Sequence, residues 1–146
     1  MDTVKLTVQL GIPAAAAWEV LADFPGFLKW AGGRHGDIEI EGHGVGMIRH
    51  MDIPGAGKMA ERLDQLDHSR KTIGYSLVYG NPAGMREYRA IVTLEDIVED
   101  GDTGCRINWH GEFTPAEGQR TDTVAGNLGA AYQGMSEALV KYVNDG

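Results

Sequence analysis

Two oppositely charged side chains in the middle of the chain are predicted to meet on one face of a β-hairpin. The sequence PGAG at residues 54–57 is a strong turn signal. Cross-strand partners counted from this turn place Arg49 opposite Glu61. Both residues share strand parity with apolar neighbours, so the two charges are predicted to face the interior, where a lone charge is very costly. If both charges are buried, they are therefore expected to pair with each other.

This pair has two possible roles. It could orient the polar end of a ligand, with Glu61 as the candidate catalytic residue if the protein is an enzyme. It could equally be a structural ion pair that only fixes the register of the hairpin.

Four large aromatic residues with polar tips are predicted to face the same interior. Their rings supply apolar wall and their O–H or N–H groups supply directional contacts, the mix that small-molecule pockets use. This pattern favours a pocket, with plain core packing as the alternative. The four residues are Tyr75, Tyr88, Trp109 and Tyr132.

Phe24, Phe27 and Trp30 stand beside a Pro-Gly break. They are predicted to form the wall or mouth of the pocket, or else to hold two short helices against the sheet. The remaining predicted ligand-binding residues are Met51, Met59, Leu128 and Met135.

No metal site and no cofactor site are predicted. The five histidines fall in turns or on the outward parity of their strands, at no spacing that puts two on one helical face. No G-x-S-x-G sequence and no Cys/His arrangement marks a nucleophile. Cys105 lies on the inward parity of its strand and is predicted to be a small core residue.

The element that must cover this pocket is a helix predicted at residues 121–144. At about 100° per residue, its apolar side chains fall on one arc roughly 120° wide. Gly126, Gly129 and Gly134 lie off that arc, and each costs about 1 kcal/mol relative to alanine. The helix is therefore expected to depend on tertiary packing. The arc comprises Val124, Leu128, Ala131, Tyr132, Met135, Ala138, Leu139 and Tyr142.

The rest of the chain reads as strands, apart from one region near the amino terminus. Alternation predicts a first strand at residues 4–10, after which Pro13 opens a helix that runs to about Phe24. Pro25-Gly26 is expected to break it, leaving a short helical turn at residues 27–30 before Gly32-Gly33. Six strands are predicted at residues 37–42, 45–53, 58–66, 71–79, 86–98 and 103–114, with an acidic hairpin turn at residues 99–102. The fold class is α+β, with one curved seven-stranded antiparallel sheet around the long helix.

Composition limits the possible partners. A chain of 146 residues is the size of one domain, and residues 1–146 are expected to form a single ligand-binding domain. The net charge of −8 argues against nucleic acid and anionic membranes. One cysteine, no charged leader and no stretch long enough to span a bilayer predict a cytoplasmic protein. The expected assembly is a monomer or a homodimer.

The order of elements and the sequence of residues 44–67, GVGMIRHMDIPGAGKMAERLDQLD, resemble the START-like (SRPBCC) helix-grip superfamily. Within it, the chain is similar to bacterial proteins described as polyketide cyclase/dehydrase, a branch related to the plant abscisic-acid receptors. The similar motifs are G-x-G-x-x-R, then a loop, then E-R-L-x-x-L-D. The resemblance implies an apolar cavity between sheet and helix that takes a small hydrophobic ligand.

The two loops that close over the hormone in the plant receptors differ here. The corresponding residues 52–57 and 80–84 read DIPGAG and GNPAG, and neither is the receptor motif. Hormone recognition is therefore not implied, although both loops keep the Pro and Gly that suit a pocket mouth.

Three functions are compatible with these residues and with the resemblance. The first is a protein that binds a lipid-like, polyketide or other aromatic molecule in its cavity. The second is a polyketide cyclase or dehydratase that uses Glu61 or a tyrosine as general acid or base. The third is a subunit or chaperone whose partner is another protein.

Overall fold

We describe a computed structural model of the chain, which covers residues 1–31, 35–99 and 102–146. Apart from a short 3-10 turn within the predicted loop at residues 80–84, the order of its elements is that predicted from the sequence. They are β1 (Asp2–Leu10), α1 (Ala14–Leu21), the 3-10 helix η1 (Phe24–Lys29), β2 (Asp37–Glu41), β3 (Ile48–Ile53), β4 (Gly57–Asp67), β5 (Thr72–Tyr79), the 3-10 turn η3 (Pro82–Gly84), β6 (Met85–Glu99), β7 (Asp102–Pro115) and α2 (Thr121–Asp145).

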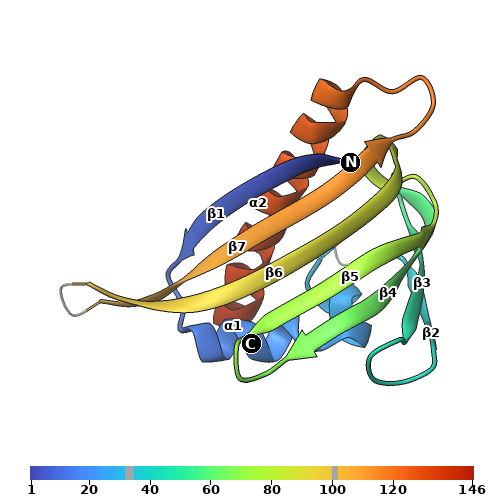
Figure 1. The fold of residues 1–146 in the computed structure, drawn as a ribbon. Coiled ribbons are helices and arrows are strands. Elements are labelled where there is room, and N and C mark those ends of the chain that lie inside the picture. Colours follow the sequence, from blue (N-terminus) through green and yellow to red (C-terminus); the bar gives the residue numbers. More distant parts are fainter. Residues whose placement is uncertain (32–34, 100–101) are drawn as a thin grey trace.

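The seven strands form one antiparallel sheet in the order β1-β7-β6-β5-β4-β3-β2. Figure 1 shows the sheet curving around α2, with α1 and η1 at one end of it. The first strand closes the sheet beside the last, since β1 pairs with β7 along its whole length. This is the predicted fold class, a helix-grip arrangement of one sheet and one long helix.

Irregular pairing bends the strand that carries Glu61. The register between β4 and β5 shifts between Ala60 and Glu61 and again between Leu63 and Gln65. An extra residue in one strand of an antiparallel pair increases the local twist and bends that strand. The first of these irregularities lies next to Met59 and Glu61, which line the cavity described below.

The core lies where α2 meets β1, β6 and β7. The buried residues of α2 are spaced three or four positions apart, as expected for an amphipathic helix, and comprise Val124, Leu128, Tyr132, Ser136 and Leu139. Gly111 on β7 makes room for one of them, because a Cβ atom there would collide with the Tyr132 hydroxyl. No helix of the described residues is both long and apolar enough to cross a membrane.

Three predicted boundaries differ from the structure by three residues, namely the start of β3, the end of α1 and the start of η1. The strand predicted from residue 45 begins at Ile48, and Val45 is 61 % exposed. Its neighbours Gly44 and Gly46 have φ values of +67° and +100°, so the chain turns there instead of extending.

The first helix ends at Leu21 rather than near Phe24, and Pro25-Gly26 lies inside η1 instead of breaking a helix. Proline is compatible with the start of a helical turn, where its missing N–H is not needed. The predicted turn at Gly32-Gly33 and the centre of the acidic turn, Asp100-Gly101, lie outside the described residues.

Candidate ligand-binding cavity

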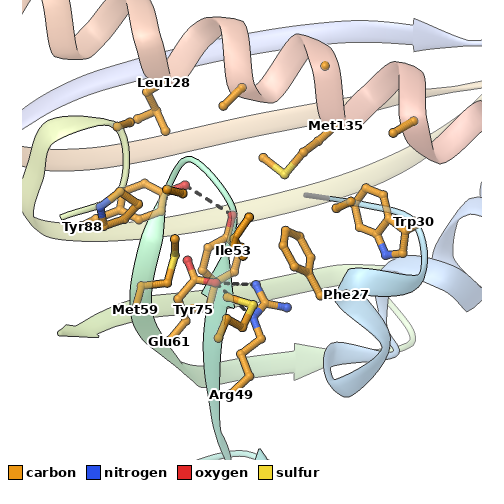
Figure 2. A pocket seen from close by; sticks show the side chains of 18 of the residues that line it. Phe27, Trp30, Arg49, Ile53, Met59, Glu61, Tyr75, Tyr88, Leu128 and Met135 are labelled. Carbon is orange, nitrogen blue, oxygen red and sulfur yellow. Dashed lines mark hydrogen bonds and ion pairs between the residues drawn. The ribbon is translucent and has the colours of Figure 1, made fainter. Parts of the chain in front are cut away.

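A cavity of about 600 Å³ lies between the sheet and α2. Figure 2 shows Leu128 and Met135 reaching down from α2 toward side chains of the sheet, with Phe27 and Trp30 at one side. The predicted site residues that line the cavity are Phe27, Trp30, Arg49, Met51, Met59, Glu61, Tyr75, Tyr88, Leu128 and Met135. Further described residues that line it are Ala31, Ile53, Ala56, Pro82, Ala83, Met85, Ala131, Gly134, Ala138, Lys141 and Tyr142.

Arg49 and Glu61 form a buried ion pair at the sheet side of the cavity. They are opposite each other in the β3–β4 register, which confirms the predicted pairing. Arg49 Nε and Nη2 donate to Glu61 Oε1 at 3.0 and 2.6 Å, and Nη1 donates to the carbonyl oxygen of Phe24 at 3.2 Å. Arg49 is only 4 % exposed and Glu61 only 6 %. Such charge-assisted hydrogen bonds are stronger than neutral ones.

Aromatic rings hold the Arg49 guanidinium in place. Its Cζ atom lies 3.9 Å from the ring centroid of Phe24 and 4.2 Å from that of Phe27, with Tyr75 at 5.4 Å. These distances are within the range of cation–π attraction. Phe24 is therefore placed behind the guanidinium and not among the cavity-lining residues, whereas Phe27 contacts both the guanidinium and the cavity.

The ion pair leaves hydrogen-bonding capacity toward the cavity. Both hydrogen bonds that Arg49 donates to Glu61 end on the same oxygen, Oε1. The pair thus leaves Oε2 of a cavity-lining carboxylate for a further donor. A ligand hydroxyl or a bound water can supply that donor.

Three tyrosine hydroxyls form a chain beside the ion pair. The hydroxyls of Tyr75 and Tyr88 are 3.3 Å apart, and those of Tyr88 and Tyr132 are 2.6 Å apart. Burial raises the pKa of each of these phenols above its ordinary value, and the Glu61 carboxylate raises the pKa of Tyr75 further. All three therefore stay protonated at neutral pH and are suited to hydrogen bonding instead of acting as bases.

Tyr132 and Trp109 lie behind the cavity wall. Their rings stack with centroids 4.6 Å apart and an interplanar angle of 16°. Neither residue is among those that line the cavity, and both are almost fully buried. They support Tyr88 from behind through the hydroxyl contact of Tyr132.

Ser136 is a buried polar residue that was not predicted from the sequence. It accepts a hydrogen bond from Trp109 Nε1 at 2.9 Å and donates one to the carbonyl oxygen of Tyr132 at 2.8 Å. The predicted arc gave no signal for it, because at about 100° per residue Ser136 falls about 40° beyond Tyr132, just outside that arc. Its burial follows from the Trp109 and Tyr132 partners that satisfy its hydroxyl.

The exposed lining residues mark the mouth of the cavity. Ala56 belongs to the β3–β4 turn, and Ala131, Gly134 and Lys141 belong to α2. Pro82 of the β5–β6 loop also lines the cavity, so both loops that were predicted to suit a mouth contribute to it.

Gly134 borders the cavity, although the helical pattern places it off the apolar arc. A Cβ atom added there would meet no atom within 4 Å. With Ala131 and Ala138 on the same side of α2, it leaves space where larger side chains would fill the cavity.

No group of three or more His, Cys, Asp or Glu side chains within the described ranges could hold a metal ion. Two histidines have specific partners: His68 accepts a hydrogen bond from Trp18 Nε1, and His50 lies between Tyr79 and Glu41. Cys105 is buried, and burial together with Asp96 raises the pKa of its thiol to about 11, which makes it a poor nucleophile.

A sequence model described as "Polyketide cyclase / dehydrase and lipid transport" matches residues 1–144, nearly the whole chain. The chain belongs to this family. The family description covers both enzymes and lipid carriers, so membership supports a hydrophobic-ligand class without choosing between catalysis and transport. No curated protein matches the chain.

Solved structures show the same fold at low sequence identity. The structure of the protein XoxI from Bacillus cereus has a TM-score of 0.82 at 18 % identity, covering 99 % of this chain and 97 % of that one. A solution structure from Thermobifida fusca has a TM-score of 0.74 at 22 % identity, covering 97 % and 93 %. The crystal structure of Ara h 8.0201 has a TM-score of 0.74 at 18 % identity and covers 99 % of both chains. At these identities the likeness shows the fold alone.

Proposed function

We propose that this protein binds a small hydrophobic molecule in the cavity between the sheet and α2. The observation that carries the proposal is a cavity of about 600 Å³, within the range of small-molecule sites, whose wall is mostly apolar and contains one buried ion pair. Burial of apolar ligand surface contributes roughly 25 cal/mol per Å². Oε2 of Glu61 and the hydroxyls of Tyr75 and Tyr88 offer hydrogen bonds to an uncharged polar group of the ligand.

Two residues of α2 provide a matched test of this proposal. Gly134 borders the cavity and Gly126 does not, yet a Cβ atom at either position would meet nothing within 4 Å. Both Gly134→Leu and Gly126→Leu should fold, since each removes a helix glycine that costs about 1 kcal/mol relative to alanine. Only the leucine at residue 134 occupies cavity volume.

The assay is binding of the neutral dye N-phenyl-1-naphthylamine, whose fluorescence rises in an apolar site. We expect Gly134→Leu to weaken dye binding about tenfold, equal to about 1.4 kcal/mol, and Gly126→Leu to leave it unchanged. A folded Gly134→Leu variant that binds the dye as tightly as the wild type would contradict the proposal. Native mass spectrometry of freshly purified protein should also show a co-purified apolar molecule.

Catalysis on the same scaffold is the second candidate, and one observation favours it. Glu61 is a buried carboxylate that lines the cavity and keeps Oε2 for a donor, as a general base requires. The protonated tyrosines are suited to polarising a carbonyl instead. A family that includes polyketide cyclases and dehydrases is compatible with this role.

Glu61→Gln separates the two candidates. Its amide oxygen can still accept the hydrogen bonds of Arg49, while the carboxylate is lost. Binding without catalysis predicts that dye affinity is retained and that no substrate is turned over by either protein. An enzyme predicts turnover of a polyketide-type substrate by the wild type and its loss in Glu61→Gln.

A further inference from the structure

The charged residues of the cavity are unevenly distributed between its deep side and its mouth. The described lining residues include two cations, Arg49 and Lys141, and one carboxylate, Glu61. The cavity therefore carries a net charge of about +1 by count of these residues, in a chain whose net charge is −8.

The deep charges cancel each other. Glu61 accepts two hydrogen bonds from Arg49, at 3.0 and 2.6 Å. An anion placed against this guanidinium would also lie beside the Glu61 carboxylate, and like charges at such a distance repel. The deep side thus accepts neutral hydrogen-bond donors and disfavours a negatively charged group.

The cation at the mouth is not cancelled in this way. Lys141 lies on α2 three positions after Ala138 and seven after Gly134, which places all three on the side of the helix that borders the cavity. No acidic group in the described part of the chain comes within ion-pair distance of its ammonium. An anionic ligand group can meet Lys141 while remaining close to water.

We propose that the ligand is a hydrophobic carboxylic acid that enters tail first and places its carboxylate against Lys141. This inference rests on the proposed function of the cavity. A single ammonium matches a head group with one negative charge better than a phosphate monoester, which carries about −1.5 to −2. The apolar tail then lies among Met59, Leu128 and Met135.

The test compares two probes of equal chain length, dodecanoate and dodecan-1-ol, by displacement of N-phenyl-1-naphthylamine. We expect the wild type to prefer dodecanoate about fivefold at low salt, the upper end for a partly exposed ion pair. The preference should shrink as salt is added. Lys141→Gln should abolish it and Lys141→Arg should retain it. Lys5→Gln, the same charge change at an exposed residue of β1 outside the cavity, should leave it intact.

The possible results distinguish this inference from the proposed function. Equal affinity for the two probes in the wild type would refute the proposal that the ligand is a carboxylic acid held by Lys141. A preference that survives in Lys141→Gln would refute it as well. Neither result would contradict the proposal that the cavity binds a hydrophobic molecule. A dye that binds but is displaced by neither probe would also refute the carboxylic-acid proposal. If the dye itself does not bind, the proposed function fails together with the inference.

Discussion

Replacing both members of the buried ion pair by apolar residues should separate its structural role from its role in ligand binding. The informative set is Arg49→Met, Glu61→Leu and the double variant. Arg49→Met alone leaves the buried Glu61 carboxylate without the two hydrogen bonds it now accepts. Glu61→Leu alone leaves a guanidinium that is 4 % exposed with the Phe24 carbonyl oxygen and the neighbouring rings. Each single change should lower the free energy of unfolding by about 3–5 kcal/mol.

The double variant should recover most of that loss. Methionine is flexible, packs well against aromatic rings and can occupy the space between Phe24 and Phe27. Replacing a buried ion pair by apolar residues of similar volume is often neutral or stabilising, so we expect the double variant within about 1 kcal/mol of the wild type. The coupling energy of the double-mutant cycle is then several kcal/mol.

Urea unfolding followed by circular dichroism measures the free energy of unfolding of each variant. The affinity for dodecan-1-ol measures the effect on ligand binding. If the pair orients a ligand hydroxyl, the stable double variant should bind this alcohol more weakly while binding 1,6-diphenyl-1,3,5-hexatriene, a hydrocarbon dye with no hydrogen-bond donor, as before. Single variants as stable as the wild type would refute the burial argument. A double variant with unchanged alcohol affinity would show that the pair is structural only.

Other predictions concern the core behind the cavity. Gly111→Ala should cost about 1–3 kcal/mol of unfolding free energy, because its Cβ atom collides with the Tyr132 hydroxyl, and the cost should be smaller in a Tyr132→Phe background. Ser136→Ala should cost about 1–3 kcal/mol in urea unfolding, since Trp109 Nε1 loses its acceptor. Cys105, whose pKa is raised to about 11, should resist iodoacetamide at pH 8 until urea unfolds the protein. Because burial raises the pKa of Tyr132 above 10.0, the folded state binds more protons than the unfolded state above that pH, so the contribution of Tyr132 to stability is fully present below about pH 10 and is lost as the pH rises further. A flat urea midpoint between pH 9 and pH 11 would contradict this last prediction.

The sequence could predict the sheet and the charged pair because both follow from short-range patterns. A Pro-Gly turn and a period of two determine which residues face each other, so the pairing of Arg49 with Glu61 could be predicted. The start of β3 could not be predicted, because Val45 continues the apolar alternation. Only the left-handed backbone of its glycine neighbours ends the strand. Parity also cannot tell a side chain that lines a cavity from one that lies behind the wall, as Tyr132 does.

The sequence pattern also could not predict that Gly134 borders the cavity. A helical arc predicts which residues point inward, but not whether the inward space is filled. Ala131 and Ala138 were on the predicted arc as core residues, and the structure places both beside the cavity with Gly134. The path of the sheet relative to α2 decides this outcome, and the register shifts between β4 and β5 were not predicted from the alternation of apolar residues.

Two neighbouring sides of α2 have different roles in the fold. Val124, Leu128, Tyr132, Ser136 and Leu139 anchor the helix, and the side that contains Ala131, Gly134 and Ala138 gives the cavity its width. Substitutions on the second side can therefore change the size and shape of the cavity without removing the contacts that anchor the helix. A few helix positions thus determine the volume of the cavity, while the β-sheet stays as it is.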